Sequence, residues 1–452
     1  MSKSQIHDLT SGSISKTLIR FALPFLGSSL LQFLYGVVDM IVVGQFSDAA
    51  GVTAVNNSSQ IMQLVTSLIC GIATGGTVLL GQYIGAKKYQ EAGKTVGSMI
   101  YLFVGLAAVI TALLLIFGNG IVTLLQVPAE AVTPARGYLR ICGIGTAFIV
   151  GYNVVSSILR GIGDSKRPMY FIAISCLLNI VGDLILVGRF HLGAEGAAIA
   201  TVAAQAVSFL CALITLCRSG LPFPVDRHPE TKKLTKVMQL GLPVAFQDMF
   251  ATLSFIIITV VVNMIGLSQS AAVGVVERII GFSMVIPVAF MSALAVFTAQ
   301  NIGAEQQARA KSGLRISLFI SLGLTLILFL IMQFFPEFLM GIFTPDEQVI
   351  YHGALYLHTY SIDSLMVCFV FCLNGFFSGC GHTGFTMFNC LFSTFIVRVP
   401  LVILFANLAN VTMLQIGIAA PVASAVQIVI QLIYYRSGRW DKPLLAKEEV
   451  SA

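Results

Sequence analysis

Two acidic residues stand inside apolar stretches, and each has a polar neighbour four positions before it. Asp39 follows Tyr35 in the run QFLYGVVDMIVVG, and Asp183 follows Asn179 in LLNIVGDLIL. Residues four apart share one face of a helix, so a phenol and an amide lie beside the two carboxylates. Thr201, in the small-residue run AAIATVAAQ, adds a hydroxyl on the next apolar stretch. Such oxygens suit Na⁺, or two acids that share a proton.

A carboxylate near the centre of a bilayer costs about 2.5–3.5 kcal/mol on insertion scales. It therefore persists where it faces an interior cavity, a partner or an ion. The alternative for Asp39 and Asp183 is a hydrogen-bonded packing network without a transport role. The residues alone leave that alternative open.

Five further charged residues fall inside apolar stretches of the second half: Asp248, Glu277, Arg278, Asp363 and Arg398. Glu277 and Arg278 are adjacent, so on a helix they point about 100° apart and do not simply pair with each other. Asp363 and Arg398 are candidate partners across neighbouring stretches. Asp248 is expected close to a helix start, near the cytoplasmic interface. Any of the five is a candidate for a substrate cavity.

The composition shows which elements must position these residues. Hydrophobic residues make up 57% of the 452 residues and charged residues only 10%, against roughly 25% charged in soluble domains. Stretches of roughly 20 apolar residues, long enough to cross a bilayer as helices, recur along the chain. The sequence therefore predicts an all-α polytopic membrane protein with twelve transmembrane helices. The expected spans are 17–44, 52–82, 95–117, 137–159, 168–188, 194–217, 237–265, 271–300, 314–335, 350–377, 384–406 and 412–435.

The two halves of the chain repeat each other. GQYIGA matches AQNIGA, which pairs Gly85 with Gly303, and FALPF matches LGLPV, which pairs Pro24 with Pro243. Six spans per half is an even number, so both copies insert with the same orientation. We expect two six-helix bundles related by a parallel pseudo-two-fold axis along the membrane normal. This duplication is typical of transporters that work by alternating access.

The repeat does not extend to the two acids of the first half. Asp39 falls opposite Ile258, and Asp183 falls opposite Leu401. A symmetric structural need would more naturally be met in both halves. The asymmetry therefore favours a special role for the acids of the first half.

The placement of lysine and arginine predicts the orientation in the membrane. Most of the 26 basic residues fall in connections on one side if the N-terminus is cytoplasmic, as the positive-inside rule requires. We therefore expect both termini in the cytoplasm, an N-terminal lobe over 1–217, a cytoplasmic linker over 218–236 and a C-terminal lobe over 237–452 with a short tail. The formal charge of +6 reflects this bias, and we expect no nucleic-acid partner.

The chain resembles the multidrug and toxic compound extrusion (MATE) family, most closely its DinF-like prokaryotic branch. The resemblance covers essentially all twelve spans. It is carried by LPFL around Pro24, by GQYIGA and its echo AQNIGA, by LRGIGD at 159–164 and by RVP at 398–400. The polar residues of the N-terminal lobe stand beside these motifs.

The resemblance implies a proton- or sodium-binding site in the N-terminal lobe. Asp39 and Asp183 would be the coupling carboxylates, and the other members would support them. The implied ion-coupling set is Asp39, Asp183, Asn179, Tyr35, Thr201 and Asn153. Pro24 would be associated with bending of the first helix.

One departure from the family concerns the C-terminal lobe. The NorM-like branch carries an acid eight residues after the Leu-Pro proline of span seven, and that place is Ala251 here. Asp248 lies three residues earlier, on a different face, and Asp363 is displaced by about one turn from the acid of span ten. The N-terminal lobe is therefore the main candidate for the ion site, and the C-terminal lobe lacks the acid positions of the NorM-like branch.

These observations together predict a secondary antiporter in a prokaryotic plasma membrane. It would export amphipathic, often cationic, organic compounds in exchange for H⁺ or Na⁺, as a monomer among membrane lipids and without a cofactor. A flippase of lipid-linked oligosaccharide or lipid is the alternative, although Arg278 and Arg398 are the only lysine or arginine residues away from the ends of the predicted spans. No Ser/His or HExxH arrangement falls in a span, so we do not expect an enzyme.

Overall fold

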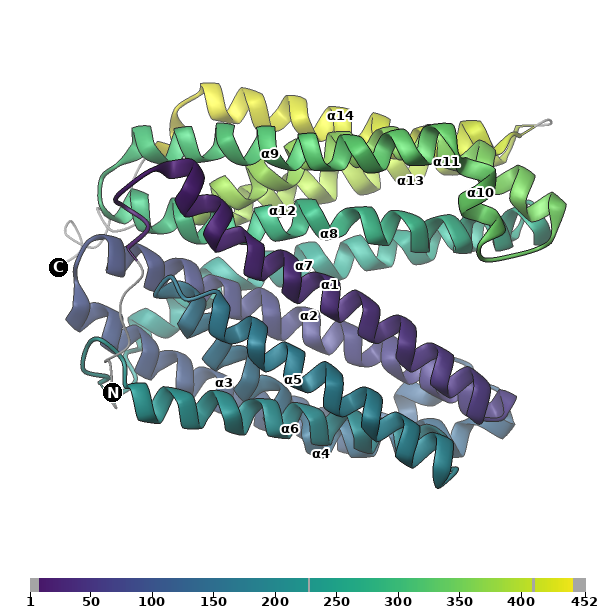
Figure 1. The fold of residues 1–452 in the computed structure, drawn as a ribbon, viewed down its shortest axis with the longest axis horizontal. Coiled ribbons are helices and arrows are strands. Elements are labelled where there is room, and N and C mark those ends of the chain that lie inside the picture. Colours follow the sequence, from purple (N-terminus) through teal and green to yellow (C-terminus); the bar gives the residue numbers. More distant parts are fainter. Residues whose placement is uncertain (1–7, 227, 409–410, 442–452) are drawn as a thin grey trace. The chain divides into compact units, whose positions relative to one another are not determined.

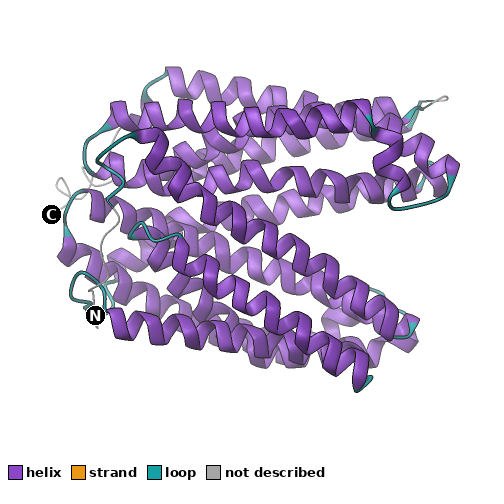
Figure 2. Cartoon of the chain, in the orientation of Figure 1, coloured by secondary structure: helices purple, strands orange, loops and turns teal. Residues whose placement is uncertain are grey.

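The computed structural model describes residues 8–226, 228–408 and 411–441. Within those residues every regular element is a helix, and twelve spans are long and apolar enough to cross a membrane. The predicted all-α fold with twelve spans is confirmed (Figure 1, Figure 2). The α-helices are α1 Ile14–Phe46, α2 Ala49–Gly85, α3 Tyr89–Leu124, α4 Ala129–Gly161, α5 Lys166–Asp183, α6 Gly193–Ser219, α7 Thr231–Asn263, α8 Leu267–Gly303, α9 Gln307–Phe334, α10 Pro336–Gly341, α11 Glu347–Gly379, α12 Thr383–Phe392, α13 Val399–Ala406 and α14 Met413–Arg436.

Two spans contain a π-helical segment that hydropathy alone does not predict. Leu184–Arg189 (η1) continues α5, and Ser393–Arg398 (η2) joins α12 to α13. A π-helical turn places one more residue in the turn, so it changes which side chains face a neighbouring helix. Such segments are frequent at functional sites. A short 3₁₀-helix, Arg439–Asp441, follows α14.

Side-chain caps define several helix starts. The Asp48 carboxylate accepts a hydrogen bond from the backbone N–H of Gly51 at 2.8 Å at the start of α2. Asp346 does the same for α11, and Thr412 forms a capping box with Gln415 at the start of α14. These contacts satisfy N–H groups that have no partner within the helix.

The chain divides into two compact units. Unit 1 comprises residues 1–8 and 27–245, and unit 2 comprises residues 9–26 and 246–452. The division runs through α1 and α7, in each case two residues after the proline inside the helix, Pro24 or Pro243. The lobe and linker boundaries expected from the sequence stay a prediction.

Glycines allow close helix contacts inside each unit. In unit 1, a Cβ added to Gly75 of α2 would lie 2.4 Å from the backbone nitrogen of Gly241 of α7. In unit 2, a Cβ added to Gly375 of α11 would lie 2.4 Å from the carbonyl oxygen of Met291 of α8. Close backbone approach replaces the hydrophobic effect as a source of helix association in lipid, because lipid tails are themselves apolar.

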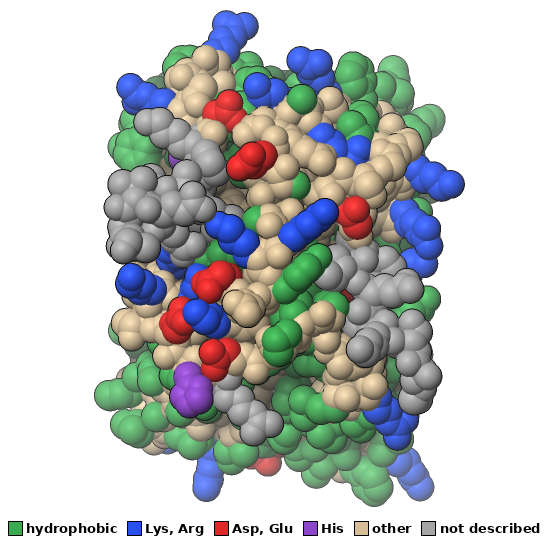
Figure 3. Space-filling model, turned by 90° about the vertical axis from the view of Figure 1, so that its left-hand side faces the viewer, with side chains coloured by type: hydrophobic (Ala, Val, Ile, Leu, Met, Phe, Trp, Pro, Cys, Tyr) green, Lys and Arg blue, Asp and Glu red, His purple; other side chains and the backbone are tan. Residues whose placement is uncertain are grey.

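In unit 1, the end of the connection between α6 and α7 and the first residues of α7 are bound to the start of α3. Lys233, only 3% exposed, pairs with Glu91 at 2.6 Å and donates to the Tyr83 hydroxyl. Lys94 bridges Glu91 and Glu230, at 3.2 and 2.9 Å. Acidic and basic side chains also gather on the face shown in Figure 3. The polar connection is therefore a packed part of unit 1.

Candidate functional site

Asp39 and Asp183 lie together in unit 1. Asp39 comes from α1, and Asp183 is the last residue of α5, directly before η1. Their carboxyl groups are within hydrogen-bonding reach of each other. Asp183 is fully buried, and one oxygen of each carboxyl group has no hydrogen-bond partner among the described residues. Two carboxyl groups in direct contact hold one proton between them more readily than two negative charges.

Asn179 links Asp183 to α6. In the amide orientation that satisfies both of its ends, its nitrogen donates to Asp183 Oδ2 at 2.8 Å. Its oxygen then accepts from the backbone nitrogen and the hydroxyl of Thr201, each at 3.2 Å. The helices can come this close because Gly182 faces Ala200, where an added Cβ would lie 2.9 Å from the alanine Cβ. The amide thus fixes the orientation of the Asp183 carboxyl group.

Tyr35 completes the cluster from α1. Its hydroxyl lies close to that of Thr201, and it interacts electrostatically with both acids. The structure therefore unites five of the residues singled out in the N-terminal half. We call them the acid-pair site: Tyr35, Asp39, Asn179, Asp183 and Thr201.

Asn153 and Pro24 contribute differently. The Asn153 amide donates to Ile149 O at 2.8 Å and accepts from the Cys70 thiol at 3.2 Å. Within the described part of the chain it makes no hydrogen bond to the acid-pair site. Pro24 lies inside α1, which continues as one helix through it. The roles of both residues stay predictions.

The charges of unit 2 form a second group around Arg398. Its Nη2 donates to the Tyr360 hydroxyl at 2.9 Å. Glu277 and Asp363 interact electrostatically with Arg398. Among the described residues, neither acid forms an ion pair with it at 4.0 Å or less. The expected partnership of Asp363 and Arg398 is therefore electrostatic and not a direct contact.

Asp248 and Arg278 are the other two charged residues of unit 2 that the sequence singles out. The structure corrects the expected place of Asp248, because α7 begins at Thr231 and Asp248 lies near the middle of this helix of 33 residues. The sequence predicts a later start for this helix, at residue 237, because Thr231–Lys236 is polar like the linker before it. Arg278 is exposed.

Two tyrosines that the sequence does not single out lie beside these charged groups. Tyr138 of α4 is 6% exposed and interacts electrostatically with Tyr35, Asp39 and Asp183. Tyr360 is the hydrogen-bond partner of Arg398. Tyr360 lies three residues before Asp363 on one helix, and this spacing predicts that the two side chains lie near each other. Nothing in the local sequence connects Tyr138 to the acids.

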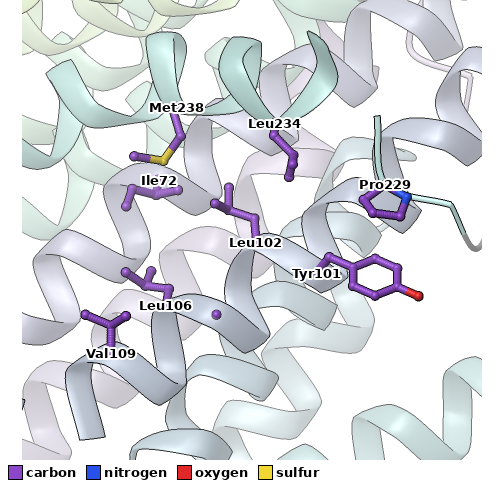
Figure 4. A pocket seen from close by; sticks show the side chains of 9 residues that line it. Ile72, Tyr101, Leu102, Leu106, Val109, Pro229, Leu234 and Met238 are labelled. Carbon is purple, nitrogen blue, oxygen red and sulfur yellow. The ribbon is translucent and has the colours of Figure 1, made fainter. Parts of the chain in front are cut away.

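A separate pocket of about 460 Å³ opens on unit 1 between α2, α3 and the start of α7. Figure 4 shows the side chains that line it, among them Leu102, Leu106 and Met238. It contains none of the acid-pair residues, and its walls are almost wholly apolar. In the described residues no cluster of three or more His, Cys, Asp or Glu has the arrangement of a metal site.

Comparison with known proteins places the chain among transporters. "Probable multidrug resistance protein YpnP" of Bacillus subtilis (strain 168) is 27% identical over 98% of this chain and 99% of the relative. The "FAD transporter" of Shewanella oneidensis is 26% identical over 78% of this chain and 79% of the relative. A solved structure described as the outward-facing conformation of a multidrug resistance MATE family transporter of the MOP superfamily has the same fold. Its TM-score is 0.91 at 21% identity, over 97% of this chain and 98% of that one.

The family model agrees with the internal repeat. The MatE model matches residues 24–185 and again residues 243–404, so each half of the chain carries one copy. The DinF-like branch stays a prediction. Because the two matches cover well over half of the chain, the chain belongs to the MatE family.

Proposed function

We propose that this protein is a secondary antiporter that exports amphipathic organic compounds, cationic ones among them, in exchange for protons. The observation that supports the proton as the coupling ion is the contact between Asp39 and Asp183. Relatives named as multidrug resistance proteins support the class of substrate.

The proposed cycle depends on the charge of the acid pair. When both carboxyl groups are ionised, two like charges lie side by side in a low dielectric, so one proton is bound strongly. Uptake of the proton removes charge from the buried site and lowers the desolvation penalty. Asn179 and Thr201 keep Asp183 oriented in both states. Proton uptake from one side and release to the other would thereby drive substrate in the opposite direction.

Sodium is the alternative coupling ion, since carboxylate, amide and hydroxyl oxygens are also sodium ligands. The direct carboxyl–carboxyl contact favours the proton, because a cation between the two groups would separate them. We further propose that the protein works as a monomer in a prokaryotic plasma membrane, with both termini in the cytoplasm. Its activity is transport and not enzymatic catalysis.

The test is efflux of a fluorescent organic cation from proteoliposomes, under a pH gradient or a sodium gradient. We expect the pH gradient alone to drive efflux. Asp39→Asn and Asp183→Asn should each lower the rate by about tenfold or more, because asparagine cannot take up the coupling proton and a charged hydrogen-bond partner is worth roughly 1.5–3 kcal/mol. Asp48→Asn is the matched control, because asparagine also caps a helix.

Two results would contradict the proposal. Efflux driven by a sodium gradient at constant pH would show that the coupling ion is Na⁺ and not the proton. Full pH-driven efflux by both acid variants would remove the acid pair from the mechanism.

A further inference from the structure

Arg398 occupies an unusual position for a base inside a membrane span. It lies in the apolar span Thr383–Ala406. Its guanidinium carbon is 4.5 Å from the centre of the Phe255 ring and 5.7 Å from that of Tyr360. Tyr360 also accepts its hydrogen bond from Nη2 at 2.9 Å. Aromatic rings therefore cover the guanidinium, and all three residues belong to unit 2.

Most of the hydrogen-bonding capacity of Arg398 is unused within the described residues. A guanidinium has five N–H donors in a planar fork, and the contact with Tyr360 employs one of them. No described carboxylate approaches within 4.0 Å. A guanidinium with N–H groups to spare can donate two parallel hydrogen bonds to a carboxylate or a phosphate.

Two acids interact electrostatically with Arg398 but form no ion pair with it among the described residues. Asp363 is 5% exposed and lies beside Ser424, and its Oδ1 has no hydrogen-bond partner among the described residues. Glu277 is half-buried and feels the charge of Arg398. An unpartnered buried carboxyl oxygen calls for a donor, either a proton or a donor group of a ligand. The group thus combines unused donors on Arg398 with an unpartnered acceptor on Asp363.

The local helix geometry explains how Arg398 reaches this place. Arg398 is the last residue of η2, and Pro400 follows two positions later. Proline has no N–H for the bond to the preceding turn, which favours a change of helical geometry there. The result directs the side chain to Phe255 of α7 and Tyr360 of α11.

We propose that Arg398 binds an anionic group, a carboxylate or a phosphate, of an amphipathic substrate, and that Asp363 and Glu277 face donor or amine groups of the same molecule. The inference rests on the proposed transport function, because the ligand is the cargo. It widens the substrate class from organic cations to zwitterionic and anionic amphipaths.

The test compares the binding of matched probes to the purified full-length protein by fluorescence anisotropy. Rhodamine B, with a free carboxylate, is paired with rhodamine B ethyl ester, which lacks it. Flavin mononucleotide is paired with riboflavin, which lacks the phosphate. We expect wild type to bind the anionic member of at least one pair on the order of tenfold more tightly. The pair that shows this preference identifies carboxylate or phosphate as the group bound.

Three variants assign the preference. Arg398→Gln should abolish it and Arg398→Lys should retain part of it, because lysine keeps the charge but not the fork. Tyr360→Phe should weaken it by a few-fold while leaving the arginine in place, so the role of Arg398 remains testable even if Arg398→Gln folds poorly. Arg436→Gln, at an exposed arginine of the same unit, should leave it unchanged.

The outcomes separate this inference from the proposed function. Equal binding within both pairs by wild type, or an unchanged preference in Arg398→Gln, overturns the anion site even where pH-driven efflux of the ester is intact. Absence of gradient-driven efflux, with the anion preference still dependent on Arg398, overturns the antiporter and leaves the binding site standing.

Discussion

At the scale of single residues, the acid-pair site is held in place by Asn179. Its amide nitrogen contacts Asp183 at 2.8 Å, and its oxygen contacts Thr201. Asn179 is 3% exposed, so water cannot easily replace the donor if the amide is lost. A buried polar group that loses its partner costs about 1–3 kcal/mol.

We therefore expect Asn179→Ala to slow pH-driven efflux by roughly tenfold. Thr201→Val should slow it only a few-fold, since it removes one hydroxyl and leaves the contact between Asn179 and Asp183. Thr215→Val is the control, because the Thr215 hydroxyl bonds to Cys211 O in its own helix. Initial rates in proteoliposomes measure the effect. A larger loss in Thr201→Val than in Asn179→Ala would show that the hydroxyl, and not the amide, positions the acid.

Much of this site could be predicted from sequence spacing. The pairs Tyr35/Asp39 and Asn179/Asp183 follow from the rise of a helix, and an acid inside an apolar span already indicates an interior position. Tyr138 could not be predicted in the same way, because its proximity to the acids depends on the packing of α4. Likewise, charge alone predicts an acid as the hydrogen-bond partner of Arg398, whereas the structure shows the hydroxyl of Tyr360 on another helix.

At the scale of elements, the connection before α7 shows why a polar segment can be rigid. A Cβ added to Gly93 of α3 would lie 2.0 Å from the carbonyl oxygen of Pro224, and one added to Gly97 would lie 1.8 Å from that of Asp226. A hydrogen bond from the backbone of His228 also lowers the pKa of Asp226. The sequence indicates a polar linker here. Its packing against α3 depends on Gly93 and Gly97, and the sequence does not show which segment these glycines contact.

We expect Gly97→Ala to destabilise the protein by about 1–3 kcal/mol, as overpacking of a tight contact does. The clash is with backbone, so a rotamer change cannot relieve it. Gly105→Ala in the same helix meets nothing within 4 Å, and alanine favours a helix over glycine by up to about 1 kcal/mol. Thermal unfolding in detergent should show a lower midpoint for Gly97→Ala and no loss for Gly105→Ala. Equal midpoints for the two variants would mean that the linker does not press on α3.

At the scale of the whole molecule, the duplication extends to a contact that each unit makes between a helix start and a neighbouring segment of the chain. In unit 1, Glu91 at the start of α3 binds Lys233 of α7. The repeat pairs Glu91 with Arg309, at the start of α9 in unit 2. Arg309 donates to the carbonyl oxygens of Gly12 and Ser11, each at 2.7 Å. The same repeat position thus holds the start of α7 in one unit and the residues before α1 in the other, with opposite charges.

The chemistry of the two contacts differs in a way that a variant can expose. Glu91 meets an ammonium group, whereas Arg309 meets backbone carbonyls, which need a donor. We expect Arg309→Gln to speed hydrogen exchange of residues 9–17 by roughly tenfold, through loss of about 1–2 kcal/mol of charge-assisted hydrogen bonding. Arg315→Gln, at an exposed arginine of the same helix, should leave that exchange unchanged. Because α1 continues from this segment in unit 2 to Asp39 in unit 1, the same variant should also slow pH-driven efflux. Faster exchange with unaltered efflux would show that the start of α1 is tethered without any effect on the acid pair.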